Sequence, residues 1–492
     1  MKSKSMRICL IVMAAYLILG ALFYPIAGDS LHFTSDITET VSAKATIESL
    51  EMGDTVHQSF LCEYDVLQSL TVIPSTMAKQ KTDVIEVSLT DDGGNEVYNT
   101  RFGADMLRDH EEFTIPIDPD NGGIPNAKGR YFTLHLTSTA GTKGNAITFY
   151  YGNSVDTGRI DVPVQIEDTE ALYFNGERMT DENGVPCSLC LQIGGTNDHW
   201  VGPYYWFLYA GGALLLAALL AYLLSCHRKG KKNILVGVAC SIFKYAFLIR
   251  QLVARDFKTK YKRSVLGMLW SFLNPLLTMS IQYVVFSTIF KSTIPNFVIY
   301  LLSGIICYNF FNEATGMCLM SIIGNASLIN KVYVPKYIYP FSRTLSSGIN
   351  LLLSLVPLLI MLIVTRTPIT SAILLLPFVL LMLFLFSYGV GLILATMMVF
   401  FRDTQFLWGI FSMLLMYLTP IFYPDSIIPS QFMTVYKLNP LYHILRFIRS
   451  ILIDGVSLEP KAYLYCIVLC MIPFLVGVII FRKNQDKFVL NI

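Results

Sequence analysis

The sequence predicts a membrane protein with all-α spans, an N-terminal anchor span, an inserted extracellular β-sandwich domain and a second, linking span. Three observations support this fold class. Of the 492 residues, 53% are hydrophobic and only 15% are charged, whereas soluble domains carry about 25% charged residues. Long apolar stretches recur along the chain. The charge is also divided very unevenly between two parts of it.

The acidic charge is concentrated in one segment. Residues 28–203 hold 28 acidic and 10 basic side chains, a formal charge of −18, while the rest of the chain carries +20. We therefore expect a water-exposed acidic domain inserted into a basic, membrane-bound chain. The bases flank apolar stretches and form no face with interleaved aromatic residues, which favours membrane lipids over nucleic acid as a partner.

Eight stretches are long enough to cross a membrane, which takes about 20 apolar residues. They are residues 8–26, 204–226, 266–290, 297–320, 338–364, 371–399, 406–423 and 462–481.

Lys and Arg residues beside the spans predict the orientation, because they favour the cytoplasmic side. Such residues precede the first span, follow the second and follow the last. Both termini are therefore expected in the cytoplasm, and the acidic segment outside the cytoplasmic (plasma) membrane. The predicted domains are an anchor (1–27), an extracellular domain (28–203), a helix with a basic linker (204–232) and the main helical domain (233–492).

The first stretch could instead be a cleaved signal peptide. Its apolar core exceeds the roughly 7–15 residues usual for such peptides, and no convincing cleavage site follows. We therefore favour a retained anchor.

The acidic segment has the pattern of short strands. Residues 84–89, 113–117, 131–136 and 146–151 are rich in β-branched and aromatic residues, and a turn cluster of Asp, Gly and Asn occupies 91–95. This pattern predicts a β-sandwich or jelly roll. Such folds often bind sugars, but a spacer or partner-docking role fits equally well.

Three of the ten cysteines lie in this domain, namely Cys62, Cys187 and Cys190. The spacing of Cys187 and Cys190 allows a local disulfide, Cys62 could be the partner of either, and plain thiols are the third alternative. Neither a second Cys-x-x-Cys nor paired histidines accompany them, so we expect no metal site. The other seven lie in or beside apolar spans, where Cys is a small hydrophobic residue.

A basic segment follows the second span. Residues 228–263 hold eleven bases and one acid, Asp256. Tyr245, Leu248, Ile249 and Leu252 recur at helical spacing and predict an amphipathic helix at the inner membrane surface. Its bases would face lipid headgroups or a cytoplasmic partner. We expect Asp256 to be an exposed residue that organises Arg255 or Lys260, or that meets a base on the partner.

Three blocks with ordered spacing continue from this helix. The first, residues 252–276, contains an acidic–basic pair, a basic Tyr segment, Leu-Gly, Trp and Pro-Leu. The second, 325–336, ends in Lys-Val-Tyr-Val-Pro-Lys, and the third comprises 418–424 and 438–441. Together they resemble the permease subunits of ABC exporters for O-antigen, teichoic acid and other polysaccharides, over about residues 240–492. The family usually has an aromatic residue in place of Val334 and Arg in place of Lys336.

The resemblance implies a six-span permease that exports a lipid-linked glycan polymer or teichoic acid. It also implies a homodimer with a pore on the two-fold axis and an ABC ATPase subunit in two copies. The chain lacks the phosphate-binding motif G-x-x-x-x-G-K-[ST]. We therefore expect it to be no enzyme and to bind no cofactor, with ATP-Mg bound by the partner ATPase.

The resemblance further implies that the basic helix and the second block form the surface that couples the permease to the ATPase. The candidate coupling residues are Arg255, Asp256, Lys258, Tyr261, Leu328, Lys331, Tyr333, Pro335 and Lys336.

Aromatic and charged residues within the spans are candidates for pore lining and substrate contact. For each aromatic residue, packing or a place in the membrane interface is the alternative. Glu313 could pair with a base such as Arg343, and the two arginines near the C-terminus could meet a lipid phosphate or anchor the interface. The candidates are Trp270, Tyr283, Tyr300, Tyr308, Phe311, Glu313, Tyr417, Arg446 and Arg449.

Two other functions fit part of the sequence. A permease of the same fold could carry a drug, a peptide or a small lipid. A membrane-anchored receptor could bind a glycan through the extracellular domain, but it would need a cytoplasmic effector domain, and the predicted cytoplasmic segments are short.

Overall fold

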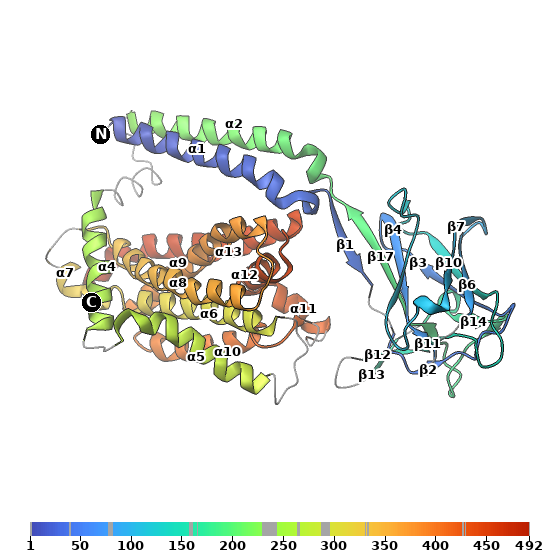
Figure 1. Ribbon diagram of the computed structural model, residues 1–492. Helices are drawn as coiled ribbons and strands as arrows, with labels where there is room; N and C mark the ends of the chain where they lie inside the picture. Colours follow the sequence, from blue (N-terminus) through green and yellow to red (C-terminus); the bar gives the residue numbers. More distant parts are fainter. Residues whose placement is uncertain are drawn as a thin grey trace. The chain divides into compact units, whose positions relative to one another are not determined.

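The computed structural model describes residues 2–38, 41–76, 82–156, 161–164, 166–228, 244–262, 266–286, 296–329, 331, 334–425, 428 and 430–491. The chain forms two compact units, each visible in Figure 1. Met1–Leu31 and Val201–Ile492 make up the helical unit, and His32–Trp200 make up the β-rich unit.

Two long helices of the helical unit, α1 (Lys2–Ala27) and α2 (Val201–Arg228), lie side by side. The Tyr16 hydroxyl donates to the backbone carbonyl of Tyr209 at 3.1 Å, and the two rings stack with centroids 5.5 Å apart. Gly20 permits this approach, because a Cβ atom there would lie 2.3 Å from the Tyr209 ring. Small residues often let membrane helices pack closely in this way.

The other helices of this unit form a bundle (Figure 1). They are α4 (Ala246–Tyr261), α5 (Trp270–Val284), α6 (Phe297–Leu319), α7 (Ala326–Ile329), α8 (Ile338–Val364), α9 (Leu376–Phe400), α10 (Thr404–Leu418), α11 (Ser430–Lys437), α12 (Pro440–Arg449), α13 (Pro460–Asn484) and α14 (Phe488–Asn491).

Among the described residues, six helical segments are long and apolar enough to cross a membrane, and they contain α1, α2, α6, α8, α9 and α13. This finding confirms the prediction of a multi-pass membrane protein with a helical membrane domain. The other two predicted spans contain shorter helices. α5 and α10 have 15 residues each, about 22 Å of helix against a hydrocarbon layer of about 30 Å.

The shortness of α10 has a local cause. The helix ends at Leu418 and Thr419 is extended, directly before Pro420, and a proline disfavours helical backbone in the residue that precedes it. For α5, the last residues of the predicted span, 287–290, lie outside the described residues.

The centre of the bundle is α6, most of whose side chains are buried. α13 packs closely on α9 through two glycines, since a Cβ atom at Gly477 would lie 2.2 Å from the Gly389 carbonyl oxygen. Side chains from α6, α8, α9, α12 and α13 share one apolar core. The surrounding helices thus enclose α6 and fix its position in the bundle.

The β-rich unit contains seventeen described strands. They are β1 (Phe33–Ile37), β2 (Ala45–Thr46), β3 (Thr55–Leu61), β4 (Val66–Val72), β5 (Pro74–Ser75), β6 (Val84–Asp91), β7 (Glu96–Gly103), β8 (Phe113–Pro116), β9 (Ile124–Pro125), β10 (Tyr131–Ser138), β11 (Thr148–Gly152), β12 (Ser154–Asp156), β13 (Asp161–Pro163), β14 (Leu172–Phe174), β15 (Glu177–Arg178), β16 (Ser188–Leu189) and β17 (Leu191–Asp198).

Its largest sheets are antiparallel. One has the strand order β15-β14-β3-β10-β6-β7, and the other β1-β17-β4-β8 with β9 paired to β4. Leu134 of β10 and Leu70 of β4 belong to the same buried cluster, so both sheets contribute to one core. The prediction of a β-rich domain is confirmed, and the sandwich arrangement stays a prediction.

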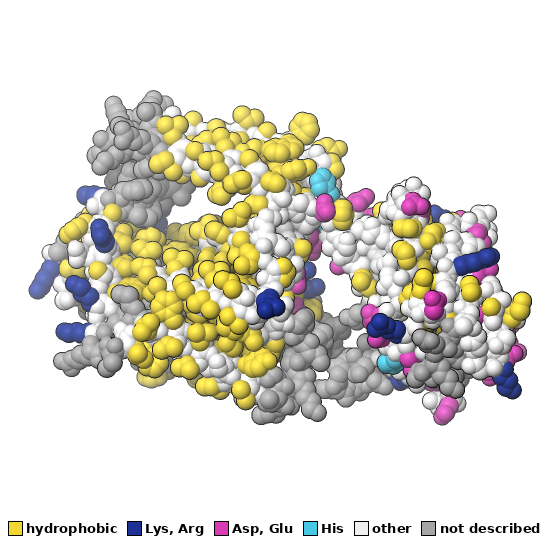
Figure 2. All heavy atoms as spheres, viewed as in Figure 1, with side chains coloured by type: hydrophobic (Ala, Val, Ile, Leu, Met, Phe, Trp, Pro, Cys, Tyr) yellow, Lys and Arg dark blue, Asp and Glu magenta, His cyan; other side chains and the backbone are white. Residues whose placement is uncertain are grey.

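Surface chemistry differs between the units. Hydrophobic side chains cover much of the visible face of the helical unit, whereas acidic and basic side chains are scattered over the β-rich unit (Figure 2). Leu352 and Ile363 of α8, for example, are 58% and 69% exposed. Such apolar exposure is unfavourable in water and fits a helical unit surrounded by lipid.

Cys62, Cys187 and Cys190 are buried free thiols, so the local disulfide considered for Cys187 and Cys190 is not formed. The residues between the two cysteines form strand β16. Three residues of extended chain span about 10 Å, more than a disulfide can bridge. Burial raises the pKa of the Cys190 thiol to about 12, which keeps it protonated and unreactive at neutral pH.

Candidate functional site

The basic helix α4 packs on the bundle through its predicted apolar stripe. Ile249 and Leu252 are each 5% exposed, and Tyr245 and Leu248 pack beside them against a cluster that includes residues of α8 and α9. The stripe therefore faces protein, not the lipid assumed in the simplest interpretation of an amphipathic helix. The sequence pattern identified the correct face of the helix but not what covers it.

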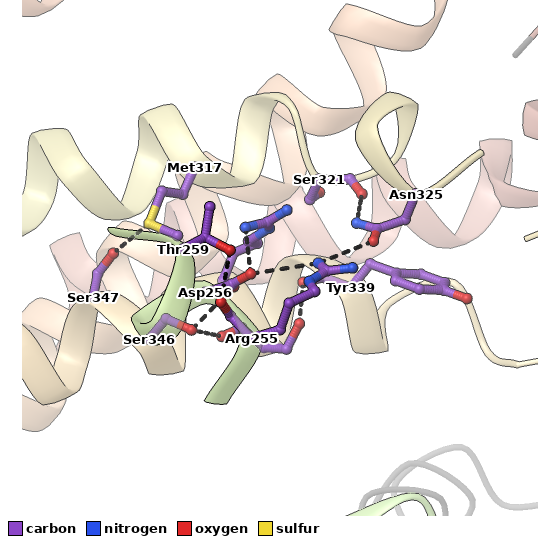
Figure 3. Close-up of polar contacts among 11 residues, drawn as sticks. Arg255, Asp256, Thr259, Met317, Ser321, Asn325, Tyr339, Ser346 and Ser347 are labelled. Atoms are coloured by element: carbon purple, nitrogen blue, oxygen red, sulfur yellow. Dashed lines mark hydrogen bonds and ion pairs between the residues drawn. The ribbon is translucent and has the colours of Figure 1, made fainter. Parts of the chain in front are cut away.

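Asp256 is the polar anchor of this contact (Figure 3). Its carboxylate lies 2.7 Å from Arg343 Nη1 of α8 and accepts a hydrogen bond from the Ser346 hydroxyl at 3.2 Å. The Asp256 side chain is 6% exposed and that of Arg343 22%. The expectation that Asp256 is an exposed residue of the coupling surface is therefore wrong, because Asp256 is buried in an ion pair between α4 and α8.

Arg255 links the same helix to the loop that follows α6. Its guanidinium lies 3.4 Å from Asp256 and donates to the Asn325 side-chain oxygen at 3.2 Å. Asn325 is 3% exposed and donates to the Ser321 carbonyl at 2.7 Å. Figure 3 shows this chain of contacts running from Ser346 through Asp256 and Arg255 to Asn325.

A second ion pair connects the C-terminal end of α4 to α6. Lys260 Nζ lies 2.6 Å from Glu313 Oε1, which also accepts a hydrogen bond from the Asn350 side chain of α8 at 2.8 Å. The pairing of Glu313 with Arg343 that we considered is thus not observed. α4 is held by two ion pairs, one to α8 and one to α6.

Two neighbouring cavities share Lys260, Glu313 and Asn350. The first has a volume of about 310 Å³ and is also lined by Trp270, Asn274 and other residues of α5, α6 and α8. The second, of about 350 Å³, reaches Arg255, Asp256 and Arg343. A polar cavity thus adjoins the ion pairs that hold α4.

The other predicted coupling residues differ in exposure. Lys258 and Lys331 are exposed, whereas Leu328 and Pro335 are half-buried. Lys336 Nζ donates to the Gln485 carbonyl and lies 5.9 Å from the centre of the Phe488 ring, so it ties the loop to the C-terminal tail. The Tyr261 side chain and Tyr333 lie outside the described residues.

The aromatic candidates for the pore fall into two groups. Trp270, Tyr283 and Tyr417 are 46%, 39% and 60% exposed. Tyr308 and Phe311 are buried in the core of the bundle, where the Tyr308 hydroxyl donates to the Ser412 carbonyl and the Phe311 ring stacks on that of Phe386.

Three further candidates, Tyr300, Arg446 and Arg449, lie together at the end of the bundle away from α4. The Arg449 guanidinium is buried over the Tyr300 ring, with Cζ 3.4 Å from the ring centre, and Arg446 is exposed one turn earlier on α12. Tyr300 and Glu313 are thirteen residues apart on α6, about 20 Å along the helix. Glu313, beside α4, and Tyr300, beside the two arginines, therefore belong to two separate sites.

Sequence reasoning gave no role to Asn350 and Asn325, and treated Arg343 only as one potential partner of Glu313. A detectable signal existed for two of them, since a base and an amide inside the apolar stretch 338–364 are costly in lipid and usually have partners. No comparable signal distinguishes Asn325 from an ordinary loop residue.

Comparison with known proteins adds an independent finding. The profile of a family described as "ABC-2 type transporter" matches residues 248–453. The chain is 31% identical over 243 residues to the O-antigen export system permease protein RfbA of Klebsiella pneumoniae, which is 49% of this chain and 93% of the relative. It is 26% identical over 256 residues to RfbA of Myxococcus xanthus (52% and 98%) and 26% over 246 residues to the polysialic acid transport protein KpsM of Escherichia coli (48% and 93%).

Proposed function

This chain belongs to the ABC-2 type transporter family and resembles polysaccharide export permeases, and from this membership we propose that it exports a lipid-linked polysaccharide or teichoic acid across the cytoplasmic membrane. A separate ABC ATPase subunit supplies the energy. The chain itself binds no cofactor, and ATP-Mg binds to the ATPase.

The attachment of α4 is the observation that best supports this proposal. The Asp256–Arg343 and Lys260–Glu313 ion pairs attach the basic helix α4 to α8 and α6. Any displacement of α4 by an ATPase is thereby passed to two membrane helices. Rigid attachment is what a transmission element requires, and a lipid anchor would not need it.

The exposed bases near α4 suit an acidic partner. Lys258, Lys331 and the 48% exposed Arg255 side chain lie on or beside the helix and its neighbouring loop. Figure 2 shows Lys and Arg side chains at the end of the bundle that carries α4. Complementary charge would orient the ATPase on this end and speed its association.

Polar residues on α5 and α6 favour a pore between two copies of the chain. Asn274 and Asn309 are exposed, beside the exposed ring of Trp270. An amide in contact with lipid tails is costly, so we place this face on a water-filled path along the two-fold axis of a homodimer. Amides and an aromatic ring also suit sugar hydroxyls and sugar faces.

The orientation of the chain is part of this proposal. With α4 on the cytoplasmic side, as the distribution of Lys and Arg predicts, the β-rich unit would lie outside the membrane, where an exported polymer emerges.

ATP hydrolysis by purified protein tests the division of labour. The chain alone should show no hydrolysis, and turnover should appear when it is co-purified with its partner ABC ATPase and reconstituted in lipid. Hydrolysis by the isolated chain, free of contaminating ATPases, would contradict the proposal.

A further inference from the structure

A small cavity lies at the end of the bundle away from α4. It has a volume of about 280 Å³, close to the lower limit of roughly 300–1,000 Å³ typical of small-molecule sites. Prolines and polar side chains from α6, the segment after α10, α12 and the π-helical turn Ser450–Asp454 surround it. The polar side chains are those of Tyr300, Asp425, Tyr442, Arg446, Arg449, Ser450 and Asp454.

Arg449 is the unusual residue of this cavity. It is only 8% exposed, and its Nη2 donates to the Ile421 carbonyl at 3.1 Å, but its Nε has no hydrogen-bond partner. The guanidinium lies flat on the Tyr300 ring, and Gly304 of α6 leaves room for it, because a Cβ atom there would lie 3.3 Å from Nη2.

No carboxylate of the described residues forms an ion pair with Arg449. Asp425, one of the two acids that line the cavity, instead accepts a hydrogen bond from the Tyr442 hydroxyl at 2.8 Å and acts on Arg449 only at longer range. A buried charge without a counter-charge in direct contact is unfavourable. The π-face of Tyr300 compensates only in part, so an anion in the cavity would remove most of the remaining cost.

Arg446 provides a second cation. It lies three residues before Arg449 on α12, so the two project from the same side of the helix. A guanidinium group is planar and can donate two parallel hydrogen bonds. Two such groups therefore suit a phosphate, which offers several acceptor oxygens. The carboxylates of Asp425 and Asp454 on the same cavity wall would accept hydrogen bonds from hydroxyl groups.

We propose that this cavity binds a phosphate or pyrophosphate ester, with Arg449 and Arg446 on the phosphate and the acidic side chains toward attached hydroxyls. The inference rests on the proposed function, because a lipid-linked glycan carries such a group where lipid and sugar join. Phosphate of a membrane lipid headgroup has the same chemistry, and the test separates the two sources.

Binding to the purified full-length protein tests the proposal without ATP or export. Protein in dodecyl maltoside, a detergent without phosphate, is titrated with undecaprenyl diphosphate, with inorganic pyrophosphate and, in separate samples, with phosphatidylglycerol. The unmodified protein should bind at least one probe saturably, and Arg446→Gln should weaken that binding about tenfold, since a hydrogen bond to a charged group contributes about 1.5–3 kcal/mol.

Two further variants sharpen the test. Arg449→Lys keeps the positive charge but cannot donate two parallel hydrogen bonds, so it should also weaken binding. Thermal unfolding of this variant shows whether it still folds. Lys437→Gln is the matched control, because Lys437 is exposed on the neighbouring α11 and does not line the cavity. It should bind like the unmodified protein.

Preference for undecaprenyl diphosphate assigns the site to the exported chain, and preference for phosphatidylglycerol assigns it to the membrane. No saturable binding of any probe, or equal loss in Lys437→Gln and Arg446→Gln, would overturn the phosphate site. That result leaves the export proposal untouched, because export is measured separately by polymer at the cell surface.

Discussion

Asp256 shows at the scale of one residue how burial changes the role of a charge. Its ion pair with Arg343 is largely shielded from water. Loss of one partner of a buried ion pair costs about 3–5 kcal/mol, because the other charge is left without compensation. We therefore predict that Asp256→Ala lowers the thermal unfolding temperature and the amount of protein in the membrane. Asp403→Ala, at an exposed acid, should change neither.

A double variant separates the ion pair from a general effect of substitution. Asp256→Leu combined with Arg343→Met removes both charges and should recover much of the lost stability. Normal abundance and unfolding temperature of Asp256→Ala alone would contradict the buried role and restore the interpretation of Asp256 as an exposed coupling residue.

The sequence alone suggested candidate ion-pair partners for Asp256 and Glu313 but could not decide which pairs form. It marked Asp256 and Glu313 as acids that need partners, and named Arg255, Lys260 and Arg343 as candidates. The pairing is set by how α4 lies across α6 and α8, over separations of 53 residues for Lys260 and Glu313 and 90 for Ser346 and Asp256. Local patterns carry no information at that distance.

At the scale of elements, the exposed bases of α4 and of the loop after α6 should act on coupling and not on folding. Exposed ion pairs contribute less than about 1 kcal/mol to stability. We predict that Lys258→Glu and Lys331→Glu leave membrane abundance unchanged, while co-purification of the ATPase and polymer at the cell surface both fall. A glutamate at either position would repel the acidic surface expected on the ATPase.

The matched control is Lys483→Glu, an exposed base near the end of α13. Unchanged ATPase co-purification in both Lys258→Glu and Lys331→Glu would show that these bases face lipid headgroups only.

Hydropathy predicted the positions of the helices well, but not the length of each one. Helices occur in all eight predicted spans, but only six helical segments among the described residues are long enough to cross a membrane by themselves. The described helices of the other two spans are α5 and α10. The end of α10 depends on a local break before Pro420, which a hydropathy average does not detect.

At the scale of the whole molecule, the distribution of charge predicts the orientation. We expect an engineered cysteine at position 120 of the β-rich unit to react with a membrane-impermeant maleimide in intact cells. A cysteine at position 331, in the loop beside α4, should react only after the cells are permeabilised. The opposite pattern would contradict the predicted orientation and the placement of the α4 surface in the cytoplasm.

The limit of sequence reasoning is also clearest at this scale. The family match covers residues 248–453 and does not extend over the β-rich unit. Its strands followed from alternating hydrophobicity, as in β10, where Phe132, Leu134 and Leu136 are buried and the residues between them are not. Alternation specifies which face is buried and carries no information about a ligand.

The most direct test of the export proposal is the fate of the polymer when the chain is depleted from cells. Surface glycan, measured by composition analysis of intact cells, should fall, while lipid-linked polymer accumulates on the cytoplasmic side of the membrane. Expression of the unmodified chain should restore export, and the Lys258→Glu and Lys331→Glu double variant should not. Unchanged surface polymer in depleted cells, with no lipid-linked polymer accumulating inside, would contradict a role in polysaccharide export.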